Sequence, residues 1–273
     1  MTRPPVEACI FDLDGTVYLG DAVIQGAVAA IDRLRQAGIP VLYFTNNPTK
    51  NPLAYHTKLT SMGFVVSVEH ILTSAIVMRD WLLTQPTETT VFPIAEAALW
   101  SLLEDAGIRT STNPADIDYV LASFDRTFDY PKLQVAFDAM RAGATLIATN
   151  PDKYCPVPGG GQPDCAAIIA AIEASTDTHL AFTAGKPSTL ATQTAAARVG
   201  VPVERCLMIG DRLETDISMG AAGIQTALVM TGATTPEVLS TWDGHRPDAV
   251  YPSVVECVSA VLALTSKKHK FED

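Results

Sequence analysis

Short continuous apolar runs alternate along this chain with longer segments in which apolar residues recur every three or four positions. Short runs that end at Gly, Pro, Asn or Asp are typical of buried strands, and the longer spacing is typical of helices. Strands are predicted at residues 8–11, 39–44, 90–92, 118–124, 144–149, 206–211, 226–230 and 249–251, and helices at residues 27–37, 53–62, 74–83, 96–106, 131–142, 165–174 and 188–199. The alternation predicts βαβ units, and therefore an α/β fold with a doubly wound parallel sheet.

The pattern restarts after the polar joint at residues 85–87, which predicts two α/β parts. Residues 1–86 and 181–273 are expected to form the core domain, and residues 87–180 a smaller α/β domain inserted into it. Within the insertion, residues 150–164 are rich in Pro and Gly and are predicted to be a loop.

Composition limits the classes of function that fit. The 273 residues are 48% hydrophobic and 18% charged, which is typical of a globular protein. The formal net charge of −11 argues against a nucleic-acid polymer or an anionic membrane as a partner, because both require a basic surface. An anionic substrate would need local positive charge, from a bound metal or from a placed Lys or Arg.

The five cysteines are odd in number and form no C-x-x-C pair, so neither a disulfide framework nor a zinc knuckle fits. The amino terminus enters its first strand without a basic, apolar and cleavable leader. No apolar run approaches the ~20 residues that span a bilayer. A cytoplasmic protein is expected.

Two aspartates end the first predicted strand, within residues 8–16. Because residues two apart on a strand point to the same side, Asp12 and Asp14 can both project from its carboxyl end, where ligands bind in open α/β sheets. Two carboxylates this close repel each other unless a cation or a shared proton relieves them, so the position favours a metal. An ordinary Asp-Gly surface turn is the alternative that this stretch alone leaves open. An EF-hand loop is excluded, because Val17 stands where Gly is needed and Val23 where Glu is needed.

Polar residues also follow two other predicted elements. Thr45 and Asn46 come directly after the strand at residues 39–44, and their hydroxyl and amide can donate to phosphate oxygens, although Asn-Asn-Pro also fits a plain turn. Lys186 lies in a Gly-Lys-Pro turn beside an anion-friendly helix start, with a solvated surface lysine as the alternative. Pro187 stands where a P-loop needs Ser or Thr, which excludes that motif.

The predicted strand at residues 206–211 also ends in an aspartate, Asp211, and Asp216 follows five residues later. Asp216 and Glu214 could be ordinary acidic residues at a helix start. That reading does not explain why Asp211 should end a buried strand. In a doubly wound parallel sheet, the strand ends that carry these polar residues and the Gly-Lys-Pro turn converge at one edge.

The order of these parts resembles the haloacid dehalogenase-like superfamily of phosphohydrolases. Asp12-Leu13-Asp14-Gly15-Thr16 matches its first motif, Thr45 its second, Lys186 its third, and Gly210-Asp211 with Asp216 its fourth. The insertion between the second and third motifs is similar to the α/β cap of the type IIA branch. The residues around the motifs are most similar to those of NagD-like proteins and 4-nitrophenylphosphatases.

The resemblance implies a phosphatase that acts on a small phosphorylated metabolite. Asp12 would attack phosphorus and form an aspartyl phosphate, and Asp14 would act first as the general acid and then as the general base. Thr45, Asn46 and Lys186 would bind the phosphoryl oxygens, and Lys186 would also offset the charge that develops there.

The resemblance also implies a Mg²⁺ site, made by Asp12, the backbone carbonyl of Asp14, and Asp211. Asp216 would not bind the cation itself but would orient Lys186 or a metal-bound water. A homodimer is implied, because caps of this kind often pair. A phosphotransferase or phosphomutase on the same fold, or a non-catalytic phosphate-binding regulatory protein, is the alternative. Residues 155–164 depart from the branch, which leaves the choice of substrate open.

Overall fold

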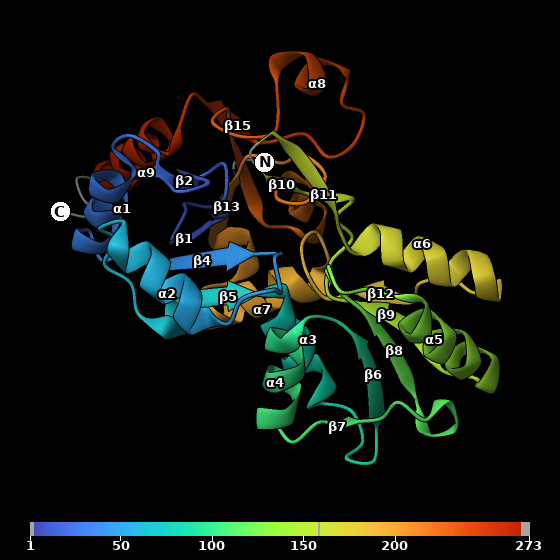
Figure 1. Cartoon of the computed structure of the whole chain (residues 1–273). Coiled ribbons are helices and arrows are strands. Elements are labelled where there is room, and N and C mark those ends of the chain that lie inside the picture. The colour runs from blue at the N-terminus through green and yellow to red at the C-terminus, as the bar shows by residue number, and fades with distance from the viewer. Residues whose placement is uncertain (1–2, 158, 269–273) are drawn as a thin grey trace. The chain divides into compact units, whose positions relative to one another are not determined.

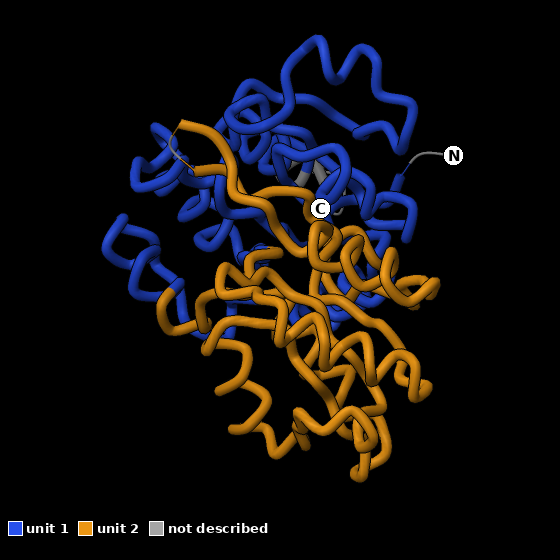
Figure 2. The backbone as a smooth tube through the Cα atoms, turned by 45° about the vertical axis from the view of Figure 1, so that its right-hand side comes forward, with its two compact units in different colours: residues 1–45, 55–72, 189–273 blue, residues 46–54, 73–188 orange. Residues whose placement is uncertain are grey.

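The chain forms two compact units, each built around its own parallel sheet. The computed structural model describes residues 3–157 and 159–268. Unit 1 comprises residues 1–45, 55–72 and 189–273, and unit 2 comprises residues 46–54 and 73–188 (Figure 2). This organisation confirms the predicted α/β class with an inserted part. The predicted domain boundaries, at 86/87 and 180/181, stay a prediction.

Unit 1 contains a six-stranded sheet with the order β15-β14-β13-β1-β4-β5. Its strands are β1 (Ala8–Phe11), β4 (Val41–Thr45), β5 (Ile71–Thr73), β13 (Cys206–Gly210), β14 (Gln225–Val229) and β15 (Ala249–Tyr251). The strands from β15 to β4 run parallel. Every residue of β1, β4, β13 and β14 is buried, because helices cover both faces of a parallel sheet.

Helices supply that cover. They are α1 (Ala27–Gln36), α2 (Pro52–Ser61), α7 (Thr189–Val199), α8 (Pro236–Thr241) and α9 (Val254–Lys268), with the 3-10 turns η1 (Val68–His70), η3 (Val203–Arg205) and η4 (Ile217–Ala222). Helix α1 packs against α9, and α7 packs against η4 and β4 (Figure 1). No helix in the described part of the chain is both long enough and apolar enough to span a bilayer.

The order in which the chain adds parallel strands to the sheet changes side at β1. The chain passes from β1 to β4 on one side and later enters β13 on the other side. In the pairing register, Phe11 lies opposite Tyr43 on β4 and Ile209 on β13. The residues that follow these three strands therefore emerge at the same edge, at the switch point where open α/β sheets bind ligands.

Unit 2 contains a five-stranded parallel sheet with the order β12-β9-β8-β6-β7. Its strands are β6 (Thr90–Ile94), β7 (Arg109–Thr110), β8 (Tyr119–Ala122), β9 (Thr145–Ala148) and β12 (Phe182–Thr183). Its helices are α3 (Ser74–Leu82), α4 (Ala97–Asp105), α5 (Tyr130–Ala142) and α6 (Cys165–Thr176), with the turn η2 (Pro114–Asp116). Helix α3 packs against α4 and α5 packs against α6, so a helix pair lies on each face of this sheet (Figure 1).

Several short elements differ from the sequence prediction. The predicted loop at residues 150–164 contains a hairpin of β10 (Tyr154–Val157) and β11 (Gly160–Pro163). Proline is tolerated there because each strand of a two-stranded sheet has an unpaired side. The hairpin of β2 (Tyr18–Leu19) and β3 (Ala22–Val23), and strands β5, β7 and β12, were not predicted either. Each has only two or three residues, which is too short to show a periodic pattern.

Candidate active site

Three carboxylates meet at the switch point of the unit 1 sheet. Asp12 directly follows β1, and its N–H donates to the carbonyl of Ile209 at 2.9 Å, which extends the pairing of β1 with β13. Asp211 directly follows β13, and Asp216 lies in the turn after it. Carboxylate oxygens of Asp12, Asp211 and Asp216 all lie within 4.8 Å of one another.

Asp211 is buried and only 2% exposed. Its Oδ2 accepts a hydrogen bond from the N–H of Ala233 at 2.6 Å, and its carbonyl accepts one from the hydroxyl of Thr234 at 2.5 Å. Its Oδ1 is buried and has no hydrogen-bond partner among the described residues. Burial, and then the charges of Asp12 and Asp216, raise the pKa of Asp211 to about 8.

This donor set fits a divalent cation. A buried carboxylate oxygen without a partner, beside two further carboxylates, is costly unless a positive charge relieves it. All the side-chain donors are oxygens, which suits a hard cation better than a thiolate- or imidazole-preferring one. The Asp14 carbonyl, also predicted as a ligand, stays a prediction.

Glycines around the carboxylates leave no room for side chains. A Cβ at Gly232 would lie 2.0 Å from Asp211 Oδ2, and one at Gly15 would lie 2.5 Å from the same atom. A Cβ at Gly210 would lie 2.2 Å from Asp216 Cγ. Sequence reasoning missed Gly232, which lies three residues beyond the end of the apolar strand β14.

Asp14 lies just beyond the cluster and is exposed. Its Oδ1 accepts a long hydrogen bond from the N–H of Gly20, at 3.4 Å. Partial desolvation raises the pKa of Asp14, against the opposing effects of the Gly20 N–H and the charge of Lys58. A carboxyl group that keeps its proton closer to neutral pH is suited to donate it.

The predicted phosphate-binding residues fall in both units. Thr45 is buried and ends β4, the strand beside β1. Lys186 follows β12, so it extends from the unit 2 sheet and not from the sheet that carries Asp12. Asn46 also belongs to unit 2, where its amide hydrogen-bonds to Lys186 and Asp152. The phosphate-binding roles of all three stay predictions.

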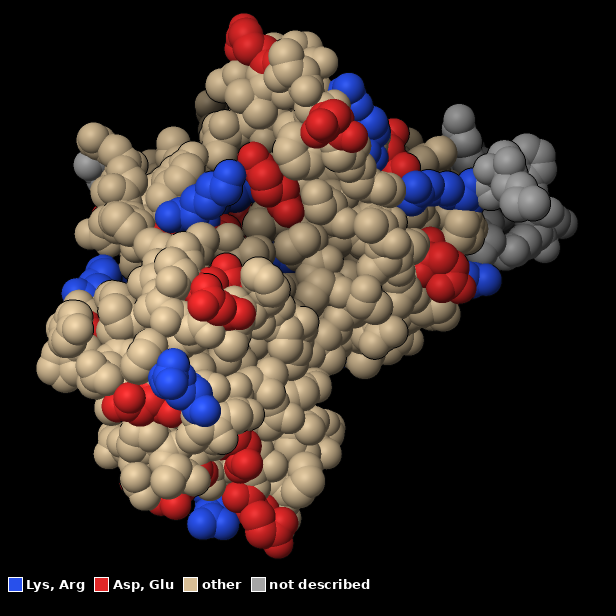
Figure 3. All heavy atoms as spheres, turned by 90° about the vertical axis from the view of Figure 1, so that its right-hand side faces the viewer, with Lys and Arg blue, Asp and Glu red and all other residues tan. Residues whose placement is uncertain are grey.

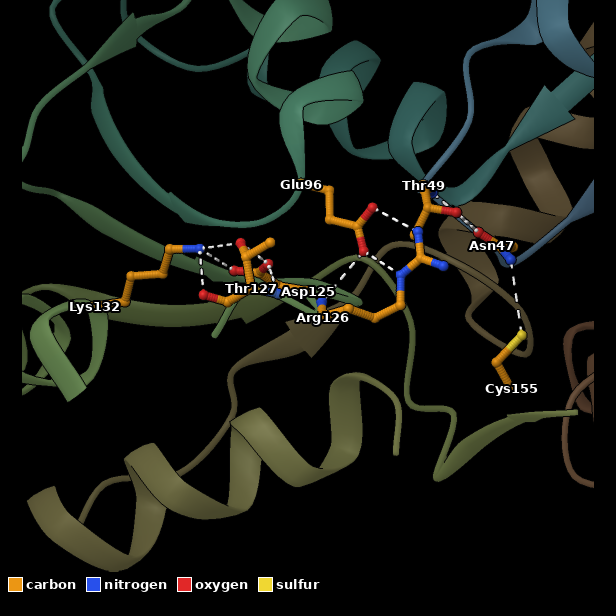
Figure 4. Close-up of polar contacts among 8 residues, drawn as sticks. All are labelled: Asn47, Thr49, Glu96, Asp125, Arg126, Thr127, Lys132 and Cys155. Carbon is orange, nitrogen blue, oxygen red and sulfur yellow. Dashed lines mark hydrogen bonds and ion pairs between the residues drawn. The ribbon is translucent and has the colours of Figure 1, made fainter. Parts of the chain in front are cut away.

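The carboxyl edge of the unit 2 sheet carries two ion pairs, which follow strands β6 and β8. Arg126 donates through Nε and Nη2 to the two carboxylate oxygens of Glu96, at 2.6 and 2.7 Å. Lys132 Nζ lies 2.6 Å from Asp125 Oδ2, and Asp125 also accepts from Thr127 (Figure 4). On the face drawn in Figure 3, acidic and basic side chains are interspersed between larger neutral areas.

Two family models match the chain. A haloacid dehalogenase-like hydrolase model matches residues 9–109, and a second HAD-hydrolase-like model matches residues 183–257. An acid sugar phosphatase from Staphylococcus epidermidis is 37% identical over 232 residues, which cover 85% of this chain and 89% of that protein. The chain belongs to the haloacid dehalogenase-like hydrolase family. The sugar-phosphatase AraL of Bacillus subtilis is 34% identical, over 82% of this hydrolase and 83% of the relative.

Solved structures place the hydrolase more narrowly. A 4-nitrophenylphosphatase from Thermotoga maritima matches with a TM-score of 0.89 and 36% identity, over 94% of this chain and 97% of that one. NagD from E. coli matches with a TM-score of 0.84 and 28% identity, over 93% of this chain and 98% of that one. The predicted resemblance to the NagD-like and 4-nitrophenylphosphatase branch of the family is therefore confirmed.

Proposed function

We propose that this hydrolase is a Mg²⁺-dependent sugar phosphatase that reacts through a phosphorylated Asp12. It cleaves small phosphate monoesters, as its family and relatives indicate. A sugar as the leaving group is supported by the relatives named acid sugar phosphatase and sugar-phosphatase AraL. The observation that carries the mechanism is the cluster of Asp12, Asp211 and Asp216, in which Asp211 Oδ1 is buried without a protein partner among the described residues.

Asp12 and Asp14 would divide the chemistry between them. In the first step, a carboxylate oxygen of Asp12 attacks phosphorus, the bond from phosphorus to the leaving oxygen breaks, and Asp14 gives its proton to that oxygen. In the second step, water attacks phosphorus, Asp14 takes a proton from the water, and the bond between phosphorus and Asp12 breaks. The raised pKa of Asp14 supports its role as the proton donor.

Asp12, Asp211 and the backbone carbonyl of Asp14 would hold the cation, and Asp216 would support them from the adjoining turn. A bound Mg²⁺ would supply positive charge against the phosphoryl oxygens and so favour their approach to carboxylates. Mg²⁺ is proposed because the donors are all oxygens and the expected substrate is a phosphate ester.

Thr45 and Lys186 are assigned to the phosphoryl oxygens, on the order of the motifs along the chain. A hydroxyl and an ammonium group would hold those oxygens in place and offset their charge, which is the main requirement of phosphoryl transfer. The cytoplasmic location and the homodimer implied by the sequence also stay proposals; light scattering on the purified protein would test the homodimer.

Phosphate release from a panel of esters tests the proposal. The panel should contain 4-nitrophenyl phosphate, several sugar phosphates, nucleoside monophosphates, phosphoglycolate and pyridoxal phosphate. We expect release that requires Mg²⁺, stops with EDTA and has its highest kcat/KM on a sugar phosphate. Binding of these esters without turnover would instead favour the non-catalytic alternative, and transfer to an added alcohol in preference to water would favour a phosphotransferase.

A further inference from the structure

We propose that Asn46 is a positioning residue whose side chain fixes the main chain of Lys186, and that Asp152 holds Asn46 in the orientation this requires. The inference rests on the proposed role of Lys186 at the phosphoryl group. It differs from the phosphate-binding role that the sequence predicts for Asn46, in which the amide would donate to the substrate.

The side-chain amide of Asn46 hydrogen-bonds to both the N–H and the carbonyl of Lys186. The N–H of Lys186 donates to Asn46 Oδ1 at 2.8 Å, and Asn46 Nδ2 donates to the carbonyl of Lys186 at 2.9 Å. Lys186 is 1% exposed and Asn46 is 9% exposed, so water does not compete freely for these bonds. Because Asn46 both donates to and accepts from the main chain of Lys186, its amide fixes the position and the orientation of that main chain.

Asp152 sets which way the amide faces. Its Oδ2 accepts from Asn46 Nδ2 at 2.8 Å and from Asn150 Nδ2 at 2.9 Å. Asn150 also donates to Asp164, whose carboxylate caps helix α6 by accepting from the N–H of Cys165 at 2.6 Å. The carboxylate of Asp152 accepts only, so the nitrogen of Asn46, and not its oxygen, must face it.

The space around this contact is closed. A Cβ at Gly185 would lie 2.5 Å from Asn46 Oδ1, 2.7 Å from the carbonyl oxygen of Thr149 and 2.9 Å from Ser74 Cβ. Ser74 also donates through its hydroxyl to the carbonyl of Asn46 at 2.6 Å. The Gly185-Lys186 segment therefore has one close-packed position against Asn46.

A fixed main chain matters more for lysine than for most residues. Its ammonium group is carried on a flexible four-carbon stem, so accuracy at Nζ depends on where the Cα is held. Asn46 follows Thr45 directly, although it lies 140 residues from Lys186 in sequence. A shift of about 1 Å at a reacting group can cost about 10²-fold in rate.

A double-mutant cycle tests the inference. We would measure kcat and KM for 4-nitrophenyl phosphate with Mg²⁺, and the Kd of inorganic phosphate by calorimetry, for Asn46→Ala, Lys186→Ala and the double variant. We expect Asn46→Ala to lower kcat/KM by about 10²-fold. In the Lys186→Ala background, the same change should alter kcat/KM and the phosphate Kd by less than about threefold, because the residue it positions is gone.

Asn113→Ala is the matched control. Asn113 Nδ2 also donates to an aspartate, Asp116, at 2.8 Å, but at an exposed site. We expect that variant to retain the wild-type kcat/KM. If Asn46→Ala costs the same factor with and without Lys186, Asn46 acts on the substrate directly and the positioning role is overturned.

A second pair of variants keeps the test decisive if Asn46→Ala does not fold. Asp152→Asn keeps an acceptor for the amide, whereas Asp152→Ala removes it. We expect Asp152→Asn to stay within about threefold of wild type and Asp152→Ala to lose activity in the way that Asn46→Ala would. A folded Asp152→Ala protein with wild-type kinetics would overturn the inference. Failure of the proposed function would be seen separately, as an inactive wild type, and the phosphate Kd cycle would still decide the role of Asn46.

Discussion

The two parallel sheets of this hydrolase carry opposite charge arrangements at their carboxyl edges. In unit 1, Asp12, Asp211 and Asp216 crowd together, and the pKa of Asp211 is raised to about 8 by burial and by its acidic neighbours. In unit 2, Arg126 hydrogen-bonds to Glu96 through two nitrogens and lowers the pKa of that carboxyl. The same βα architecture therefore supports one edge at which like charges are crowded and one edge that carries two matched ion pairs, Glu96 with Arg126 and Asp125 with Lys132.

The difference in charge arrangement means that one edge is suited to bind a ligand and the other to stabilise the fold. Matched charges stabilise the edge that holds them, and they leave no demand for a ligand. Crowded carboxylates destabilise the cation-free fold, and this cost is the basis of their affinity for a divalent ion. A variant among the three carboxylates of the first edge should therefore change activity or cation binding most, and a variant at either ion pair of the second edge should change stability most.

The largest effect is expected for Asp12→Asn. The carboxamide cannot attack phosphorus, so kcat on 4-nitrophenyl phosphate should fall by at least about 10⁴-fold while the protein stays folded. The matched change at the second edge is Asp125→Asn, which weakens the ion pair with Lys132. It should keep kcat within about threefold and lower the free energy of unfolding by about 1–3 kcal/mol. Substantial turnover by Asp12→Asn would remove the proposed nucleophile.

Asp211 should give the cation-free protein a distinctive pH dependence. Between its ordinary pKa of 3.8 and its folded value of about 8, the native state binds more protons than the unfolded state. The free energy of unfolding should therefore fall as pH rises through this range, by at most about 1.4 kcal/mol per pH unit. Urea titrations in EDTA should show this slope in the wild type and a shallower one in Asp211→Asn. Mg²⁺ should restore stability at pH 8 in the wild type only; equal slopes in both proteins would contradict the raised pKa.

Gly232→Ala tests how closely the first edge is packed. Its Cβ would press on Asp211 Oδ2, so the affinity for Mg²⁺ should fall by about 10–100-fold. Gly161→Ala is a suitable control, since the nearest atom to its Cβ belongs to the side chain of Tyr154. Mg²⁺ activation curves would compare the two variants. Unchanged Mg²⁺ affinity in Gly232→Ala would show that the loop after β14 moves aside.

The sequence predicted the first edge better than the second, for physical reasons. Asp12 and Asp211 end short, uninterrupted apolar runs, and a charge in that place is visible without coordinates. Strand β12 has two residues and no period, so the sheet to which Lys186 belongs could not be predicted. Asp152 lies in a segment whose Pro and Gly content indicated only a loop, and its contact with Asn46 spans 106 residues. Contacts of that length depend on packing, which local patterns do not encode.

The smallest effect is expected for the ion pair at the second edge. The Arg126 side chain is 51% exposed, so a double-mutant cycle of Glu96→Gln with Arg126→Gln should give a coupling energy of about 0.5–1 kcal/mol. Its pH dependence should have the opposite sign to that of Asp211. Because Arg126 lowers the pKa of Glu96, the stabilisation is present above the unfolded-state pKa and is lost as pH falls through the folded value. Denaturant titrations between pH 3 and 7 would measure this loss. If the coupling energy between Glu96 and Arg126 instead grows toward acidic pH, this pair does not behave as a matched ion pair, and the contrast between the two edges fails.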